Sequence, residues 1–114
     1  MRSDDLVRLR HMLDAATEAM GFARDRQRAH LDTDRQLVLA LVKEAEIIGE
    51  PACQVSGEAR AGLPAIPWAD IIGMRHRLVH AYFDINLDVL WQTVQTDLPA
   101  LAAALEPALP PPAA

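Results

Sequence analysis

Apolar residues recur at steps of three and four near the start of the chain, which is the spacing of one helix face. We expect a helix over about residues 4–23, with Ser3 as its N-cap. The apolar positions that define it are Leu6, Leu9, Leu13, Ala16 and Met20. After a polar, mixed-charge connector at residues 24–32, a wider apolar stripe over residues 37–48 predicts a second helix, capped by Thr33 or Asp32.

The middle of the chain is divided by glycine and proline. Gly49 and Pro51 are expected to weaken or bend the second helix near its end, and residues 55–68 read as a crossover with one helical turn. Pro67 can open a third helix, whose apolar and polar residues continue through Tyr82. Asn86 is a candidate cap for a fourth helix, and Pro99 can open a last short one.

This pattern predicts an all-α fold, a bundle of four to five helices with antiparallel neighbours and no sheet. The composition agrees, because 51% of the residues are hydrophobic while only 4% are aromatic, so Leu, Ile, Val, Ala and Met must fill the interior. With 114 residues the chain forms one domain, which we place at residues 1–106. Residues 107–114 are rich in proline and are expected to form a flexible tail.

Charge and cysteine content limit the classes of function. The formal net charge of −5 argues against broad adhesion to nucleic acid or to an anionic membrane, so any RNA contact must be local. The single Cys53 excludes an internal disulfide and is typical of a reducing compartment. We see no signal peptide and no apolar run long enough to span a membrane, and we expect a cytoplasmic protein with no membrane partner and no cofactor.

The third helix carries the candidate chemistry. Arg75 supplies a fixed cation that can bind a phosphate, and His80 supplies an imidazole that can move protons near neutral pH. These are the minimal parts of a metal-free ribonuclease. On an ideal helix the two side chains lie about 140° apart, so they would line opposite edges of a groove, especially if a two-fold axis brought a second copy against the first.

The motif as a whole resembles the HepT-like toxin family of the HEPN ribonuclease superfamily. The motif is Arg75, four residues, His80, one residue and Tyr82, with Pro67-Trp68 before it and Leu90-Trp91 after it. The resemblance covers nearly the whole chain. It implies a dimeric helical bundle in which two copies of the motif meet at a cleft and cut RNA, as the toxin of a type VII toxin–antitoxin pair.

The residue types indicate how such a cleavage could proceed. His80 would act as the base and Arg75 would stabilise the phosphoryl group. His80 of the partner subunit, or His76, would supply the acid, and Arg77 would join Arg75 in binding RNA. The resemblance implies a partner, an MntA-like nucleotidyltransferase antitoxin that transfers AMP onto Tyr82, and the two proteins could assemble into a larger hetero-oligomer. Many members of the family carry Asn where this chain has His76, which can replace the amide's hydrogen bonds in only one protonation state.

Two other interpretations remain open. In the first, the bundle binds a minimal nucleotidyltransferase and presents Tyr82 without cutting RNA. In the second, His76 and His80 share a metal ion at positions i and i+4 of a helix, although two histidines are too few ligands for a stable zinc site.

Overall fold

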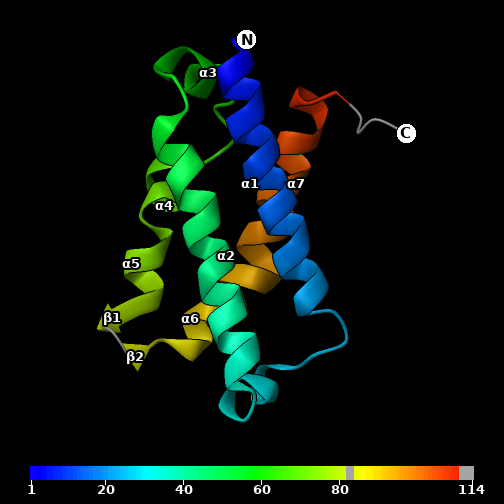
Figure 1. The fold of residues 1–114 in the computed structure, drawn as a ribbon, viewed down its shortest axis with the longest axis vertical. Helices are drawn as coiled ribbons and strands as arrows, with labels where there is room; N and C mark the ends of the chain where they lie inside the picture. The colour runs from blue at the N-terminus through cyan, green and yellow to red at the C-terminus, as the bar shows by residue number, and fades with distance from the viewer. Residues whose placement is uncertain (82–83, 111–114) are drawn as a thin grey trace.

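The computed structural model describes residues 1–81 and 84–110, and of His80 and Ala81 it describes the backbone alone. Two helices of 20 residues each, α1 (Ser3–Phe22) and α2 (Arg35–Gln54), lie antiparallel and side by side (Figure 1). Helix α7 (Leu98–Leu105) packs along α1, while α4 (Trp68–Ile72) and α5 (Met74–Leu78) pack on α2. The predicted all-α class, with antiparallel neighbours, is confirmed.

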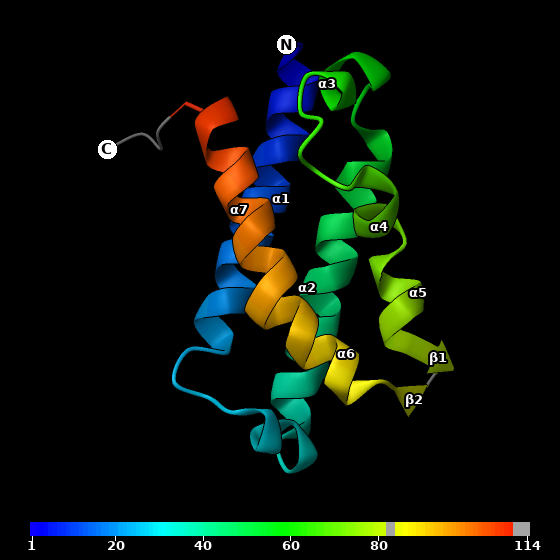
Figure 2. The same ribbon diagram turned by 180° about the vertical axis from the view of Figure 1, so that it is seen from behind.

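Shorter elements complete the bundle. Figure 2 shows that α6, η2 and α7 follow one another as a continuous helical run across the back of the molecule. The remaining elements are η1 (Arg28–Asp32), α3 (Gly57–Ala61), β1 (Val79–Ala81), β2 (Asp84–Ile85), α6 (Leu87–Gln92), the π-helix η2 (Thr93–Asp97) and η3 (Glu106–Ala108).

The core is aliphatic, as the composition predicts. Side chains from the two long helices and from the C-terminal half meet in one hydrophobic cluster. Its fully buried members include Leu9, Met12, Ile48, Met74 and Leu105, none more than 1% exposed. Each such side chain contributes roughly 1.5–3 kcal/mol through burial, so the core dominates the stability of the bundle.

The caps of the long helices differ from those expected. The N-cap of α1 is Arg2, and Ser3 lies inside the helix. The N-cap of α2 is Asp34, whose carboxylate accepts a hydrogen bond from the Leu37 amide at 3.1 Å. Asp32 and Thr33 were wrong as caps because the 3-10 turn η1 takes up Asp32 and delays the start of α2.

Pro51 does not end α2, which continues for three residues to Gln54. Two features stabilise this last turn. Ala52 is fully buried in the core, and the Arg60 guanidinium donates hydrogen bonds to the carbonyls of Ala52, Cys53 and Val55 at 3.0–3.1 Å. A cation at a helix C-terminus also interacts favourably with the helix dipole, and this compensates for the hydrogen bond that proline cannot donate.

The predicted third helix is divided, and it ends early. Gly73 separates α4 from α5, and the chain leaves the helix after Leu78. It then forms a short antiparallel pair, in which Val79 of β1 lies opposite Ile85 of β2. The backbone N–H of Asn86 donates a hydrogen bond to the Leu78 carbonyl at 2.7 Å, and this contact replaces the next helical turn. The β-branched Val79 also favours the extended backbone.

This early end corrects the helical geometry that we expected for the motif. The angle of about 140° between Arg75 and His80 requires a continuous helix, and so does the i, i+4 relation of His76 and His80. Neither applies, because His80 lies in β1. The pair of short strands is the only extended pairing in residues 1–81 and 84–110, and it leaves the bundle all-α.

The described part of the C-terminal tail packs against the bundle. Residues 106–108 form the turn η3, Leu109 is buried, and the Arg10 guanidinium donates to the Pro110 carbonyl. The domain boundary expected at residue 106 therefore falls within a packed turn. None of the helices in the described ranges has both the length and the apolar character of a transmembrane span.

Candidate functional site

Arg75 projects outward from α5, because its neighbours Met74 and Leu78 are buried on the inner side of that helix. Its Nε donates a hydrogen bond to Oε1 of Glu46 on α2 at 2.7 Å, and its side chain is 50% exposed. A guanidinium has five N–H donors, so this bond leaves the terminal Nη groups able to donate to a ligand. Arg75 is thus anchored and still accessible.

Glu46 is held as a carboxylate at this position. The hydrogen bond from Arg75 is the main reason why the pKa of Glu46 lies below its usual value, and Lys43 adds a smaller effect. The Lys43 ammonium lies 3.5 Å from Oε2 of the same carboxylate. Glu46 orients Arg75 from a position 29 residues earlier in the chain, which is why the local sequence pattern gave no signal for it.

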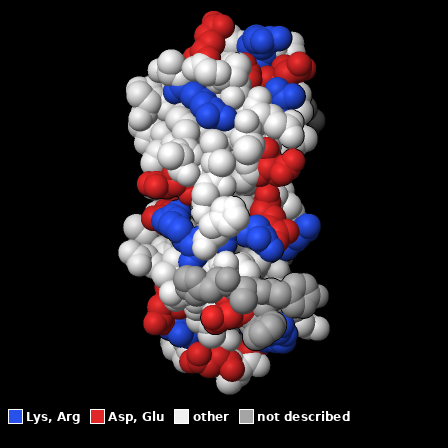
Figure 3. All heavy atoms as spheres, turned by 90° about the vertical axis from the view of Figure 1, so that its left-hand side faces the viewer, with Lys and Arg blue, Asp and Glu red and all other residues white. Residues whose placement is uncertain are grey.

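A surface depression of about 390 Å³ lies beside this ion pair. Its lining comes from α2, α5, β1 and β2, and we call it the Arg75 depression. It is lined by Arg35, Leu39, Val42, Lys43, Glu46, Arg75, Val79 and Ile85. Three cationic side chains against one carboxylate make it locally positive, although the whole chain carries a net charge of −5. Figure 3 shows basic side chains gathered across the middle of the face that carries α4 and α5.

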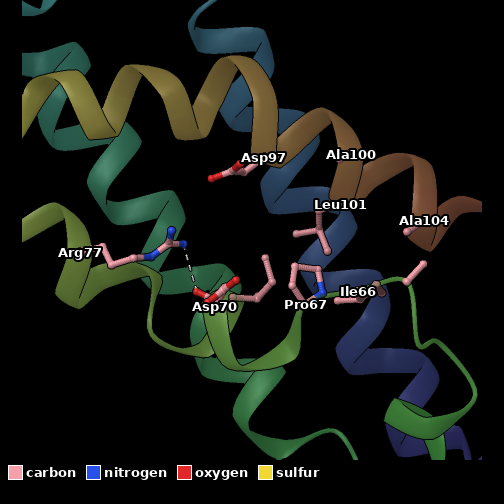
Figure 4. A pocket seen from close by; sticks show the side chains of 10 residues that line it. Ile66, Pro67, Asp70, Arg77, Asp97, Ala100, Leu101 and Ala104 are labelled. Atoms are coloured by element: carbon pink, nitrogen blue, oxygen red, sulfur yellow. Dashed lines mark hydrogen bonds between the residues drawn. The ribbon is translucent and has the colours of Figure 1, made fainter.

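Arg77 lies in a different place from Arg75. Its Nη2 donates to the Asp70 carbonyl at 3.2 Å, and the side chain borders a pocket of about 150 Å³ between α4 and the η2–α7 run. Figure 4 shows Arg77, Asp70 and Asp97 around the mouth of this pocket, which we call the Arg77 pocket. The rest of its lining is apolar and consists of Ala65, Ile66, Pro67, Ile71, Ala100, Leu101 and Ala104.

The structure therefore does not bring Arg75 and Arg77 together. Consecutive helix residues are rotated by about 100°, so two residues two positions apart point to nearly opposite sides. His76 lies between them and is exposed. A joint role of the two arginines in RNA binding stays a prediction, and the cationic surroundings favour Arg75.

The remaining motif residues lie at the edge of the Arg75 depression or beyond the described residues. The backbone of His80 belongs to β1 and directly follows Val79, which lines the depression. The His80 side chain and all of Tyr82 lie outside the described residues. In the described part of the chain, no three His, Cys, Asp or Glu side chains are grouped so that they could hold a metal ion.

Comparison with known proteins assigns the class. Residues 12–108 match the family described as "Ribonuclease HepT-like". The chain therefore belongs to the HepT-like ribonuclease family, as the motif and its sequence surroundings predict.

Individual relatives agree with this assignment. The chain is 29% identical to "Putative RNase MJ1380" of Methanocaldococcus jannaschii over 95 residues, which cover 83% of this chain and 87% of that protein. It is 37% identical to "Probable ribonuclease HepT" of Thermococcus cleftensis over 64% of this chain and 66% of the relative. It is also 31% identical to "Gamma-glutamylcyclotransferase and putative RNase MJ0434" of M. jannaschii over 89% of this chain and 46% of that longer protein. No solved structure matches the chain.

Proposed function

We propose that this protein is a metal-independent endoribonuclease and the toxin of a type VII toxin–antitoxin pair. The observation that carries the proposal is the setting of Arg75. Its guanidinium is anchored by Glu46 and half exposed in a cationic depression, and its helix α5 directly precedes the strand that contains His80. Membership of the HepT-like ribonuclease family supports the same activity.

The chemistry follows from the residue types. His80 removes the proton from a ribose 2′-OH, and this oxygen attacks the adjacent phosphorus. The bond to the 5′-oxygen breaks, and that oxygen takes a proton from His76 or from His80 of the partner subunit. The Nη groups of Arg75 donate to the phosphoryl oxygens as negative charge develops on them. The products are a 2′,3′-cyclic phosphate and a 5′-hydroxyl.

Where the acid is His80 of the partner subunit, the scheme requires a homodimer, because one chain offers a single His80 while the reaction needs both a base and an acid. A two-fold axis would place two copies of His80 near one linkage. Sedimentation of the purified protein across a concentration series tests this proposal, and a monomer at all concentrations would contradict it.

Cleavage of a labelled RNA in the presence of EDTA tests the reaction. We expect full activity with the chelator and a cyclic phosphate at the new 3′ end. His80→Ala should lower the cleavage rate by roughly 10²-fold or more, the usual scale for a general acid–base group. His11→Ala, an exposed histidine of α1, is the matched control and should cleave at the native rate. Loss of activity with EDTA would overturn the metal-independent mechanism.

The antitoxin is proposed to be an MntA-like nucleotidyltransferase that silences the toxin at Tyr82. The tyrosine oxygen attacks the α-phosphorus of ATP, pyrophosphate leaves, and AMP remains bound to the side chain. The added phosphate would place a bulky anion next to the cationic motif and compete with RNA. Intact mass after incubation with the enzyme and ATP should rise for the native chain and stay unchanged for Tyr82→Phe. Equal modification of both proteins would exclude Tyr82 as the acceptor.

Two observations favour a second candidate, a binding module without cleavage. Glu46 partly neutralises Arg75, and the chain as a whole is acidic. Expression without the nucleotidyltransferase separates the two functions, since a toxin arrests growth and a binding module does not.

A further inference from the structure

The outer face of α2 carries a regular row of residues beside Arg75. Arg35, Leu39 and Lys43 follow one another at steps of four, and Glu46 comes three residues later. All four line the Arg75 depression. With a rise of about 1.5 Å per residue, Arg35 and Lys43 lie roughly 12 Å apart along the helix axis, with Leu39 between them. The depression is therefore an elongated strip and not a single-ion site.

The apolar part of this strip is exposed to solvent. Leu39 is 47% exposed, and Val79 and Ile85 of the two short strands are only partly buried. Cationic side chains that alternate with accessible apolar surface match a single nucleic-acid strand, in which phosphates alternate with the flat faces of bases. A peptide made of acidic residues alone would pair with the cations and leave Leu39 without an apolar partner.

Arg35, Lys43 and Arg75 have the single carboxylate of Glu46 among them, whereas three other arginines each have at least one carboxylate of their own nearby. Arg26 pairs with Asp34 at 2.8 Å, and Arg28 pairs with both Asp32 and Asp88. The Arg77 pocket has two carboxylates at its mouth, which repel phosphate. The α2 strip is thus the most favourable surface for a polyanion next to Arg75.

We propose that Arg35, Leu39 and Lys43 form a strand-binding subsite that holds the RNA next to the cleaved linkage. Arg35 and Lys43 bind two phosphates of the strand, a base between them lies against Leu39, and Arg75 binds the reacting phosphate. This inference rests on the proposed ribonuclease function. It assigns RNA binding to α2, which contributes no residue to the Arg75–His80–Tyr82 motif.

Binding of a short single-stranded 2′-O-methyl RNA measures the subsite without cleavage, because the attacking hydroxyl is blocked. With three phosphate contacts, the plot of log K against log salt should have a slope of about −2, so the native protein loses roughly 18-fold in affinity between 50 and 200 mM salt. Arg35→Gln and Lys43→Gln should each reduce this slope by about 0.7. The double variant should lose only about 3-fold over the same range.

Further variants separate the contribution of charge to RNA binding from the contribution of apolar contact. Arg24→Gln removes an exposed arginine outside the strip and should keep the native slope. Leu39→Ala should weaken binding and keep the slope, because it removes apolar contact without changing charge. Since Arg35, Leu39 and Lys43 are all exposed, these variants are expected to fold, and circular dichroism checks this.

The outcomes are distinct. The subsite would be overturned if both charge variants kept the slope of the native protein. It would also be overturned if the native protein bound poly-glutamate as tightly as the modified RNA. Cleavage of unmodified RNA, measured in parallel, reports on the proposed function separately. If RNA is cut while Arg35→Gln and Lys43→Gln bind as the native protein does, the function stands and the subsite fails. If the modified RNA binds with the predicted slopes and nothing is cut, the subsite stands and the nuclease proposal fails.

Discussion

The two sides of α5 place an arginine in different surroundings. Arg75 and Arg77 stand two residues apart on this short helix, yet one borders a cationic depression against α2 and the other an apolar pocket against α7. Arg75 is bound by a carboxylate and is half exposed, whereas Arg77 donates to a backbone carbonyl of α4. The comparison shows that the surroundings of each arginine follow from the element it faces and not from its place in the motif.

The apolar residues that line the Arg77 pocket and the Arg75 depression also differ in burial, and this difference gives the largest expected effect on stability. Leu101 lines the Arg77 pocket but is only 3% exposed, so Leu101→Ala removes a core contact and should lower the free energy of unfolding by about 2–5 kcal/mol. Leu39→Ala in the Arg75 depression should change it by about 0.5 kcal/mol or less, because Leu39 is 47% exposed. Urea denaturation measures both values. Equal losses would mean that the Arg75 depression is also closed core.

The next largest effect is expected on the rate of RNA cleavage. Arg75→Ala should lower the cleavage rate by roughly 10²–10³-fold, the scale seen when one donor to a developing oxyanion is removed. Arg77→Ala is the matched control and should retain most of the activity, because its guanidinium faces the other side of α5. Single-turnover cleavage of a labelled RNA gives both rates. A loss at Arg77 as large as that at Arg75 would show that the two arginines share one site, as the sequence alone suggested.

Helical periodicity predicted most of the fold because it records which face of each helix is buried. The two long helices and the cap at Asn86 follow directly from local spacing and side-chain type. The end of α5 at Leu78 does not, because it depends on a hydrogen bond from the Asn86 amide across the turn. No pattern within residues 67–82 records that bond, so a continuous helix was the natural expectation.

The candidate site was predictable only where its residues are close in sequence. Arg75 could be chosen from its spacing to His80 and Tyr82. Glu46 could not, because its contact with Arg75 spans 29 residues and arises from the packing of α2 on α5. Arg35 and Lys43 were missed for the same reason, since on the sequence alone they are ordinary polar residues of an amphipathic helix.

Two glutamates on different faces of α2 show a similar contrast in their surroundings. Glu44 faces the core and is 3% exposed, and its Oε2 atom has no hydrogen-bond partner in the described part of the chain. Burial, followed by the hydrogen bond and charge of Glu18, raises the pKa of Glu44 to about 7. Glu46 lies two residues later and faces Arg75, which lowers its pKa.

The buried Glu44 predicts that the free energy of unfolding falls as the pH rises. The unfolded chain releases the Glu44 proton near its usual pKa of 4.5, while the folded state keeps it up to about 7. Between these values the folded state binds more protons, so the free energy of unfolding should decrease with rising pH, by on the order of 3 kcal/mol over the whole range. Glu44→Gln should abolish this decrease, and Glu50→Gln, an exposed glutamate of the same helix, should keep it. Urea denaturation at pH 5 and pH 8 provides the test, and a native decrease in Glu44→Gln would exclude Glu44 as its source.

The partly exposed Glu46 predicts the smallest effect on the free energy of unfolding, with the opposite dependence on pH. Arg75 lowers the pKa of Glu46, so the unfolded chain binds the proton more readily than the folded one. The stabilisation from this pair is therefore present above the usual glutamate pKa of 4.5, and it is lost as the pH falls through the lower value of the folded state. Because Glu46 and Arg75 are both partly exposed, Glu46→Gln should cost no more than about 1 kcal/mol at neutral pH. The difference between native protein and variant in urea denaturation should shrink toward zero in acid. A cost of several kcal/mol that persists in acid would mean that Glu46 supports the packing of α2 on α5, and that the Arg75 side of the helix is as structural as the Arg77 side.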